Sequence, residues 1–160
     1  MPPDPSPRPG AGRRADVLVC PYDFATPTYA EAVALRHAVL RVPLGRDIAD
    51  DPLHEEYDQV HLGAFAGGIL VGTASLAHTG AGLKMRQVAV AERQRGRGIG
   101  GRLVRAAEDI ARRTGAERLY CHARRVAVPF YEAQGWRAEG EPFEEVGIPH
   151  RVMVSARARG

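Results

Sequence analysis

The sequence predicts a single α/β (α+β) domain built on a mixed, mostly antiparallel sheet with helices on both faces. Its 160 residues are 44% hydrophobic and 26% charged, as in a soluble globular domain with its own core. Short apolar segments separated by glycine turns between residues 59 and 90 are typical of antiparallel hairpins. From residue 83 to 123, strand, helix and strand patterns follow one another, which is the order of a right-handed parallel crossover.

The N-terminal part of the chain should contain a tail, a strand and a helix. Residues 1–14 are rich in proline and glycine, and we expect a disordered tail ahead of one domain at residues 15–157. An apolar segment at 15–21 predicts the first strand. Apolar residues at helical spacing then predict a helix over 29–42, which Pro43 should end.

The middle of the chain predicts three consecutive antiparallel strands. An acidic connection at 45–58, with a short helix near its end, leads to the first of them at 59–66. A Gly-Gly turn joins this strand to the next, at 69–78. After a second glycine-containing turn, residues 83–90 can pair as the third strand, and its last residues are apolar and β-branched, as in a mostly buried strand.

The C-terminal part alternates helices and strands before a final hairpin. Apolar residues at i, i+4 and i+7 predict a helix from Gly98 to Arg113 with one face on the sheet. A strand at 118–123 and a second helix at 126–134 should follow. The hairpin is expected to run from 136 to 155 and to turn at Gly147.

A loop rich in arginine and glycine precedes the long helix and predicts an anion site. Glycines destabilise the first turn of a helix, so their presence favours close approach of the backbone to a ligand. A helix N-terminus offers free N–H groups and a partial positive charge, both suited to phosphate. The residues expected to bind it are Arg95, Gly96, Arg97, Gly98, Ile99, Gly100 and Gly101.

Two common phosphate motifs fit this loop poorly. A P-loop requires Gly-Lys-Ser/Thr after its first glycine, and the loop contains no lysine. Gly96-x-Gly98-x-x-Gly101 matches the dinucleotide fingerprint literally, but an acidic residue should follow about 20 positions later. Cys121 and His122 occupy that region instead. Too few residues follow to supply the remaining parallel strands of that fold.

The third motif, Arg95-x-x-Gly98-x-Gly100, resembles the signature of the GNAT superfamily of N-acetyltransferases. The longer string from Val88 to Leu103 and the segment VAVPFYEAQGW at 126–136 are similar to the same family. The segment EEVGIPHRVMV at 144–154 looks like the ElaA-like subgroup. The resemblance implies a GNAT-like (acyl-CoA N-acyltransferase) fold, with acetyl-CoA as co-substrate and an amine as acceptor.

By the same resemblance, the backbones of Val88, Ala89 and Val90 would hold the pantetheine arm, and the loop would hold the pyrophosphate. Arg124 or Arg125 could approach the adenosine phosphate. Tyr131 corresponds to the family's proton donor for the departing thiolate. The expected reaction is direct transfer from acetyl-CoA to a primary amine in a ternary complex; a non-catalytic CoA-binding or sensing module is the alternative.

Other features bear on the base, the metal and the partners. The two cysteines suggest no disulfide framework, and no apolar run is long enough to span a membrane, so we expect a cytoplasmic protein. No two of His54, His61, Cys121 and His122 have the paired spacing of a zinc site, so we expect no metal. Nucleic acid is an unlikely partner because few aromatic residues accompany the arginines. A small-molecule or peptide amine is expected, and a homodimer remains open. The candidate general bases are Glu55, Glu56, His61, Glu144, Glu145 and His150.

Overall fold

The computed structural model describes residues 16–156, so the predicted tail at 1–14 and the two ends of the predicted domain lie outside the described residues. The described residues form a seven-stranded sheet in the order β1-β2-β3-β4-β5-β7-β6. Neighbouring strands are antiparallel except β4 and β5, which are parallel. The predicted mixed, mostly antiparallel sheet is therefore confirmed.

The elements follow the predicted order closely. The strands are β1 (Val17–Tyr22), β2 (Val60–Ala66), β3 (Ile69–Thr79), β4 (Gly82–Val90), β5 (Leu119–Arg124), β6 (Trp136–Glu145) and β7 (Ile148–Ser155). The α-helices are α1 (Pro27–Arg36), α2 (Ile99–Arg113) and α3 (Val128–Ala133). The short helical segments are η1 (His37–Arg41), a turn of π-helix, and the 3-10 turns η2 (Val42–Leu44), η3 (Ile48–Asp50), η4 (Leu53–Asp58), η5 (Glu92–Gln94) and η6 (Arg125–Ala127).

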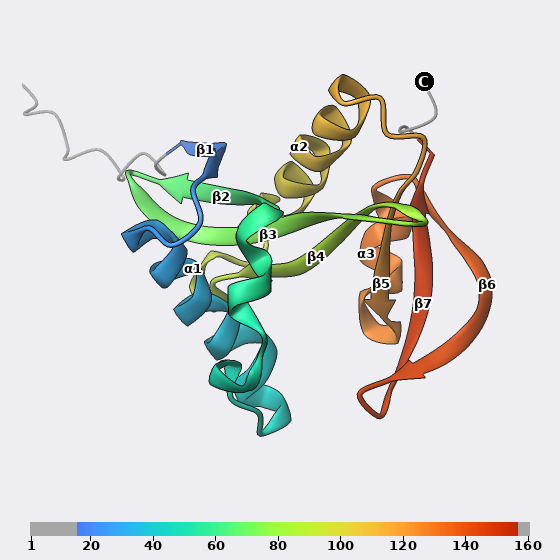
Figure 1. Cartoon of the computed structure of the whole chain (residues 1–160), viewed down its shortest axis with the longest axis horizontal. Helices are drawn as coiled ribbons and strands as arrows, with labels where there is room; N and C mark the ends of the chain where they lie inside the picture. Colours follow the sequence, from blue (N-terminus) through green and yellow to red (C-terminus); the bar gives the residue numbers. More distant parts are fainter. Residues whose placement is uncertain (1–15, 157–160) are drawn as a thin grey trace, which may run out of the picture.

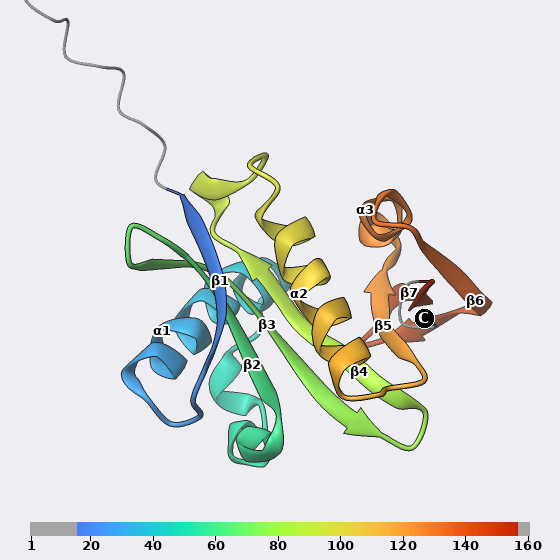
Figure 2. The ribbon, with the colours of Figure 1, turned by 90° about the horizontal axis from the view of Figure 1, so that it is seen from above.

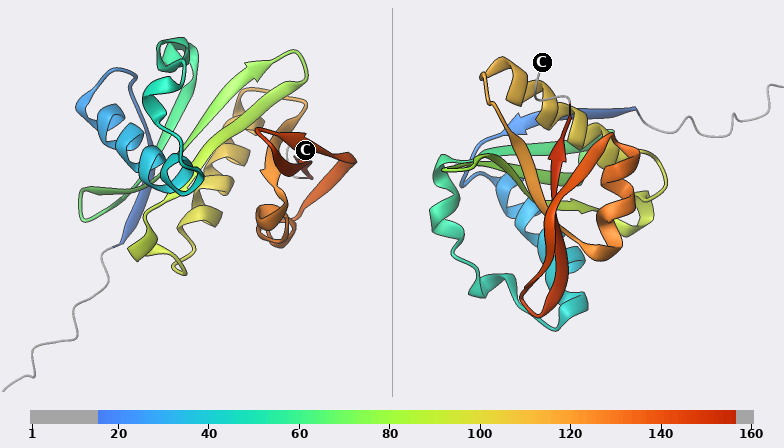
Figure 3. Two further views of the ribbon diagram at one scale, coloured as in Figure 1. Left: turned by 90° about the horizontal axis from the view of Figure 1, so that it is seen from below. Right: turned by 90° about the vertical axis from the view of Figure 1, so that its right-hand side faces the viewer.

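Helices cover both faces of the sheet. In Figure 1, α1 lies below strands β2 to β4 and α2 lies above them, and the view from above in Figure 2 places α2 over β3 and β4. Helix α3 packs beside β6 and β7 (Figure 3). The apolar stripe of α2 is buried against the sheet, as its spacing predicts. The largest fully buried apolar side chains of this core are Leu62, Leu76, Leu83, Met85, Ile99, Leu103, Leu119 and Met153.

The predicted helix at 29–42 is shorter than expected. The α-helix begins at Pro27, with Thr26 as its N-cap, and ends at Arg36. The chain continues as a π turn, η1, and then as a 3-10 turn that contains Pro43. Proline has no N–H, and its ring crowds the carbonyl four residues earlier, so a regular α-helix cannot continue through Pro43; here it already ends at Arg36, seven residues earlier. Similarly, α3 starts at Val128 rather than at residue 126, with Pro129 in its first turn.

Strand β4 contains a β-bulge and then separates from β5. Thr73 pairs with Ala89 and Ser75 with Arg86, so two residues of β4 lie opposite one residue of β3, and Gln87 there has a φ of +56°. A bulge bends its strand and increases the local twist. Strands β4 and β5 are paired only at Leu83–Leu119 and Lys84–Tyr120. Beyond Lys84, the edge of β4 that faces β5 has no strand partner in the described sheet.

Candidate functional site

The loop between β4 and α2 leaves the first turn of α2 uncapped. Gly96 and Gly98 have φ values of +78° and +74°, a left-handed conformation that glycine adopts without strain. Gly98 is the N-cap residue and has no side chain to accept a hydrogen bond from the first turn. The N–H groups of that turn have no partner within the helix, so they remain available to an anion.

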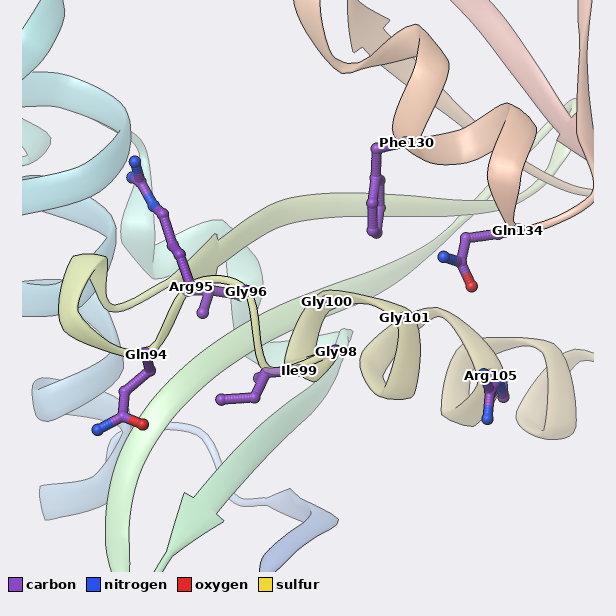
Figure 4. Close-up of a pocket in the computed structure, with 11 residues that line it drawn as sticks. Gln94, Arg95, Gly96, Gly98, Ile99, Gly100, Gly101, Arg105, Phe130 and Gln134 are labelled. Carbon is purple, nitrogen blue, oxygen red and sulfur yellow. The ribbon is translucent and has the colours of Figure 1, made fainter. Parts of the chain in front are cut away.

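A pocket of about 440 Å³ lies against this helix start. Figure 4 shows the loop on one side of it and Phe130 pointing from α3 toward the first turn of α2. Arg95 and Arg105 are the cationic side chains among the lining residues. The lining residues are Val90, Gln94, Arg95, Gly96, Gly98, Ile99, Gly100, Gly101, Arg105, Phe130 and Gln134. The loop predicted to bind phosphate therefore forms a wall of the pocket.

The glycines of the loop are required for two different reasons. A Cβ added at Gly96 or Gly98 would meet nothing within 4 Å, so these positions need glycine for their backbone conformation. A Cβ at Gly100 would lie 3.1 Å from Cζ of Phe130, and one at Gly101 would lie 3.1 Å from Oε1 of Gln134. The expectation that all four glycines serve ligand approach is thus incomplete, because Gly100 and Gly101 also let α3 pack closely on α2.

Three predicted cofactor residues do not line the pocket. Ala89 is buried in the core, and Val88 packs against the core. The resemblance assigned only their backbones to the pantetheine arm, along the part of β4 that has separated from β5. Arg97 donates a hydrogen bond from Nη1 to Oε1 of Gln94. This contact ties Arg97 to the η5 turn.

Arg124 is directed toward η1. Its Nη2 donates to the carbonyl oxygen of Leu40 at 3.3 Å, so its guanidinium is engaged by the segment that follows α1. Arg125 is exposed at the start of η6. Neither arginine is among the residues that line the pocket.

Tyr131 is buried beside Cys121, between Phe130 and Trp136. The Cys121 thiol is the side chain that acts most directly on its hydroxyl. Burial, and then Cys121, raise the pKa of the Tyr131 phenol well above 10.0, so the phenol is protonated at neutral pH. Cys121 is the first residue of β5 beyond the two residues that pair with β4. The Tyr131 side chain therefore lies at the point where β4 and β5 separate, although it does not line the pocket.

Two of the candidate bases belong to a buried ion-pair network. The Arg36 guanidinium donates from Nη1 and Nη2 to the two Glu56 oxygens at 2.8 Å each, and the Tyr29 hydroxyl donates to Oε1 of Glu56 at 2.7 Å. His61 is 2% exposed, and its Nε2 lies 3.0 Å from the Glu56 carbonyl oxygen. Burial raises the pKa of the Glu56 carboxyl, but the bonds from Arg36 and Tyr29 outweigh it and lower the pKa. Glu56 is therefore a fixed carboxylate with a structural role.

The remaining candidate bases divide into two groups. Glu55 and Glu144 are exposed, and neither forms an ion pair within residues 16–156. Glu145 and His150 lie close together, with His150 Nε2 3.6 Å from Glu145 Oε2. His122, which the search for bases in the sequence missed, places Nδ1 3.1 Å from Glu145 Oε1. Only the pairing of β5 with β7 and of β7 with β6 brings these residues together.

Neither a metal centre nor a membrane helix is present in the part of the chain that the structure describes. Within it, no group of three or more histidine, cysteine, aspartate or glutamate side chains could hold a metal ion. No helix of residues 16–156 is both long and apolar enough to cross a membrane.

Comparison with known proteins agrees with this fold. A family model described as an acetyltransferase (GNAT) domain matches residues 28–156. The chain therefore belongs to the GNAT acetyltransferase family and is an acyltransferase. Among sequence relatives, it is 27% identical over 141 residues to the uncharacterised N-acetyltransferase YitI of Bacillus subtilis, covering 82% of this chain and 93% of the relative.

Solved structures share the fold. Escherichia coli ElaA superposes with a TM-score of 0.73 at 21% identity, over 88% of this chain and 99% of ElaA. A GNAT family acetyltransferase from Elizabethkingia anophelis with acetyl-CoA bound superposes with a TM-score of 0.66 at 17% identity, over 87% and 97% of the two chains. These likenesses establish the fold, and membership of the ElaA-like subgroup stays a prediction from residues 144–154.

Proposed function

We propose that this acyltransferase moves an acetyl group from acetyl-CoA to a primary amine by direct attack in a ternary complex. The observation that carries the proposal is the pocket at the uncapped start of α2, next to the opening between β4 and β5. The structural neighbour from Elizabethkingia anophelis, solved with acetyl-CoA bound, supports the choice of co-substrate.

The residues of the pocket suit a diphosphate. The backbone from Gly96 to Gly101 offers N–H donors at the positive end of the α2 dipole, and Arg95 and Arg105 add full positive charges. The open space above Gly96 and Gly98 leaves room for a bulky anion. Val88 to Val90 would hold the pantetheine arm through the backbone on the unpaired edge of β4, as an added strand does.

When bound, acetyl-CoA supplies the activated acetyl group. Tyr131 is the proposed proton donor for the leaving sulfur, because its phenol stays protonated at neutral pH and lies at the opening between β4 and β5. Burial raises the pKa of the neighbouring Cys121 thiol to about 12. A thiol of this kind is a poor nucleophile, which favours direct transfer over an acetylated enzyme.

The loop assignment is tested at Gly98. Gly98→Asp should abolish detectable CoA binding in calorimetry, because a carboxylate would stand at the site of the diphosphate. Gly98→Asn is the matched control, since asparagine has nearly the same shape and also tolerates a positive φ. Comparable CoA affinity in both variants would refute the assignment. Gly100→Glu is a less suitable probe because its Cβ would press on Phe130.

The role of Tyr131 is tested by removing its hydroxyl. Tyr131→Phe should lower the rate of thiol release about 10²- to 10⁴-fold while CoA affinity stays within a few-fold. Tyr22→Phe, which removes a part-buried hydroxyl bonded to Thr73, controls for the loss of a phenol hydroxyl outside the proposed site. An unchanged rate in Tyr131→Phe would remove it from the mechanism. CoA binding by the wild-type protein without thiol release from any amine would favour the non-catalytic module.

A further inference from the structure

Four titratable side chains from four strands converge on one face of the sheet. Lys84 of β4, His122 of β5, Glu145 of β6 and His150 of β7 form this group, which we call the His122 cluster. Side chains alternate along a strand, so His122 lies on the face of β5 opposite Cys121 and its partner Tyr131. The cluster therefore lies across β5 from the proposed proton donor, at the end of β5 that has separated from β4.

One nitrogen of His122 has two competing partners. Its Nδ1 lies 3.1 Å from Oε1 of Glu145 and 3.3 Å from Nζ of Lys84. A carboxylate can only accept a hydrogen bond, and a lysine ammonium can only donate one. With a proton on Nδ1 the ring donates to Glu145, and without it the ring accepts from Lys84. The two contacts therefore favour opposite tautomers of the neutral ring.

The other nitrogen of His122 is free to meet a ligand. Nε2 forms no hydrogen bond with any of residues 16–156 and is not among their buried unpaired atoms, so it is reached by solvent. In the tautomer that donates from Nδ1 to Glu145, Nε2 carries a lone pair. A carboxylate that fixes the tautomer in this way prepares an imidazole to accept a proton.

We propose that Nε2 of His122 is the proton acceptor for the amine substrate, with Glu145 as the residue that positions its ring. This inference rests on the proposed function. The amine arrives as an ammonium ion, one of its N–H bonds breaks, and a new N–H bond forms at Nε2. The products are a neutral amine and an imidazolium that donates to Glu145, and the proton then passes to water.

The surrounding charges are arranged for this role. Burial raises the pKa of the Glu145 carboxyl, but the hydrogen bond from His122 and the nearby Lys84 and His150 outweigh it and lower the pKa. Glu145 is therefore a carboxylate at neutral pH. Burial lowers the pKa of Lys84, whose neighbours are Glu145, Arg86 and the Cys121 thiol. Its Nζ lies 3.3 Å from Nδ1 of His122, so Lys84 and Glu145 place opposite charges beside the same ring nitrogen.

The tautomer of His122 tests the proposal without any substrate. In the ¹⁵N-labelled full chain, imidazole nitrogen shifts report which nitrogen carries the proton, and His122→Gln identifies the signals. We expect Nδ1–H in the wild type and in Lys84→Met, where Glu145 is the remaining partner. Glu145→Ala should convert the ring to Nε2–H, and Glu144→Ala, at the exposed neighbour, should not. An Nε2–H ring in the wild type, or no change in Glu145→Ala, would overturn the proposal.

Kinetics separate this inference from the proposed function. His122→Gln should lower thiol release about 10²- to 10⁴-fold with an unchanged KM for acetyl-CoA, and His78→Gln, at an exposed strand position, should have no effect. Wild-type activity with an equally active His122→Gln would refute the proton acceptor and leave the transferase intact. A wild type that neither binds CoA nor releases thiol would overturn both.

Discussion

The Glu56 network and the His122 cluster contain the same kinds of side chain but differ in how completely they are paired. In the Glu56 network, both carboxylate oxygens accept bonds from Arg36, and Tyr29 adds a third. In the His122 cluster, one imidazole nitrogen faces two partners that require opposite protonation. The side chain of Glu56 is 7% exposed, whereas that of Glu145 is 44% exposed.

This difference distinguishes a structural carboxylate, Glu56, from Glu145, the carboxylate that we propose has a functional role. A buried carboxylate with both oxygens bonded has one stable arrangement, and it fixes the elements that carry its partners. Here Arg36 on α1 and Glu56 on η4 hold these segments together over the sheet. A partly exposed group with competing partners can change its proton at small cost. The closeness of a histidine and a glutamate therefore does not by itself identify a catalytic pair. The other hydrogen bonds that each side chain makes have to be considered as well.

Glu56→Gln should give the largest effect on stability. It leaves the buried Arg36 guanidinium without a counter-charge, which typically costs about 3–5 kcal/mol of unfolding free energy. Urea denaturation at neutral pH measures the loss, and Glu55→Gln, one position away and exposed, is the control. A loss below about 1 kcal/mol, the range of an exposed pair, would show that the network is not structural.

Acid should remove the contribution that the Glu56 carboxylate makes to the unfolding free energy. The pKa of Glu56 in the folded protein lies below its ordinary value of 4.5, so its stabilisation is complete above that value and is lost as the pH falls through the folded pKa. Asp51, whose pKa is lowered mainly by its hydrogen bond from Arg41, contributes in the same direction. We therefore expect the stability difference between wild type and Glu56→Gln to shrink below pH 4.5. A difference that stays constant down to the onset of acid unfolding would contradict this assignment.

Glu145→Ala should have the smallest effect on stability. Its contacts with His122 and His150 are partly exposed, and exposed pairs contribute about 0–1 kcal/mol. Thermal or urea unfolding of this variant should therefore resemble that of the wild type while its activity falls. A stability loss comparable to that of Glu56→Gln would make the His122 cluster a second structural network and erase the contrast.

Features encoded in neighbouring residues could be predicted from the sequence. The hairpins β2–β3 and β6–β7 follow from glycine turns between apolar segments, and the start of α2 follows from the glycines and the spacing of Ile99, Leu103 and Ala107. The pocket wall at residues 95, 96 and 98–101 follows from the same local pattern. Each of these depends on backbone conformation and hydrophobic spacing within about twenty residues.

Features that depend on tertiary pairing could not be predicted. Arg36 and Glu56 meet only because α1 and η4 pack together, so the sequence left Glu56 among the candidate bases. His122 was overlooked because Glu145 lies 23 positions away and reaches it through a strand inserted between β5 and β6. The sequence explained Gly100 and Gly101 by ligand approach alone. The packing that also requires glycine there involves Phe130 of α3 and Gln134 at its C-terminal end, which lie beyond the next strand in the chain.

The two-residue junction between β4 and β5 has a consequence for the dynamics of the sheet. Strands β1 to β4 form one hydrogen-bonded ribbon and β5 to β7 another, and backbone pairing across the junction is confined to the ends near Leu83 and Leu119. Amide protons on the facing edges beyond this point exchange with solvent without breaking a strand pair. Deuterium uptake along these edges should thus be fast in the free enzyme and slow once a pantetheine arm covers them.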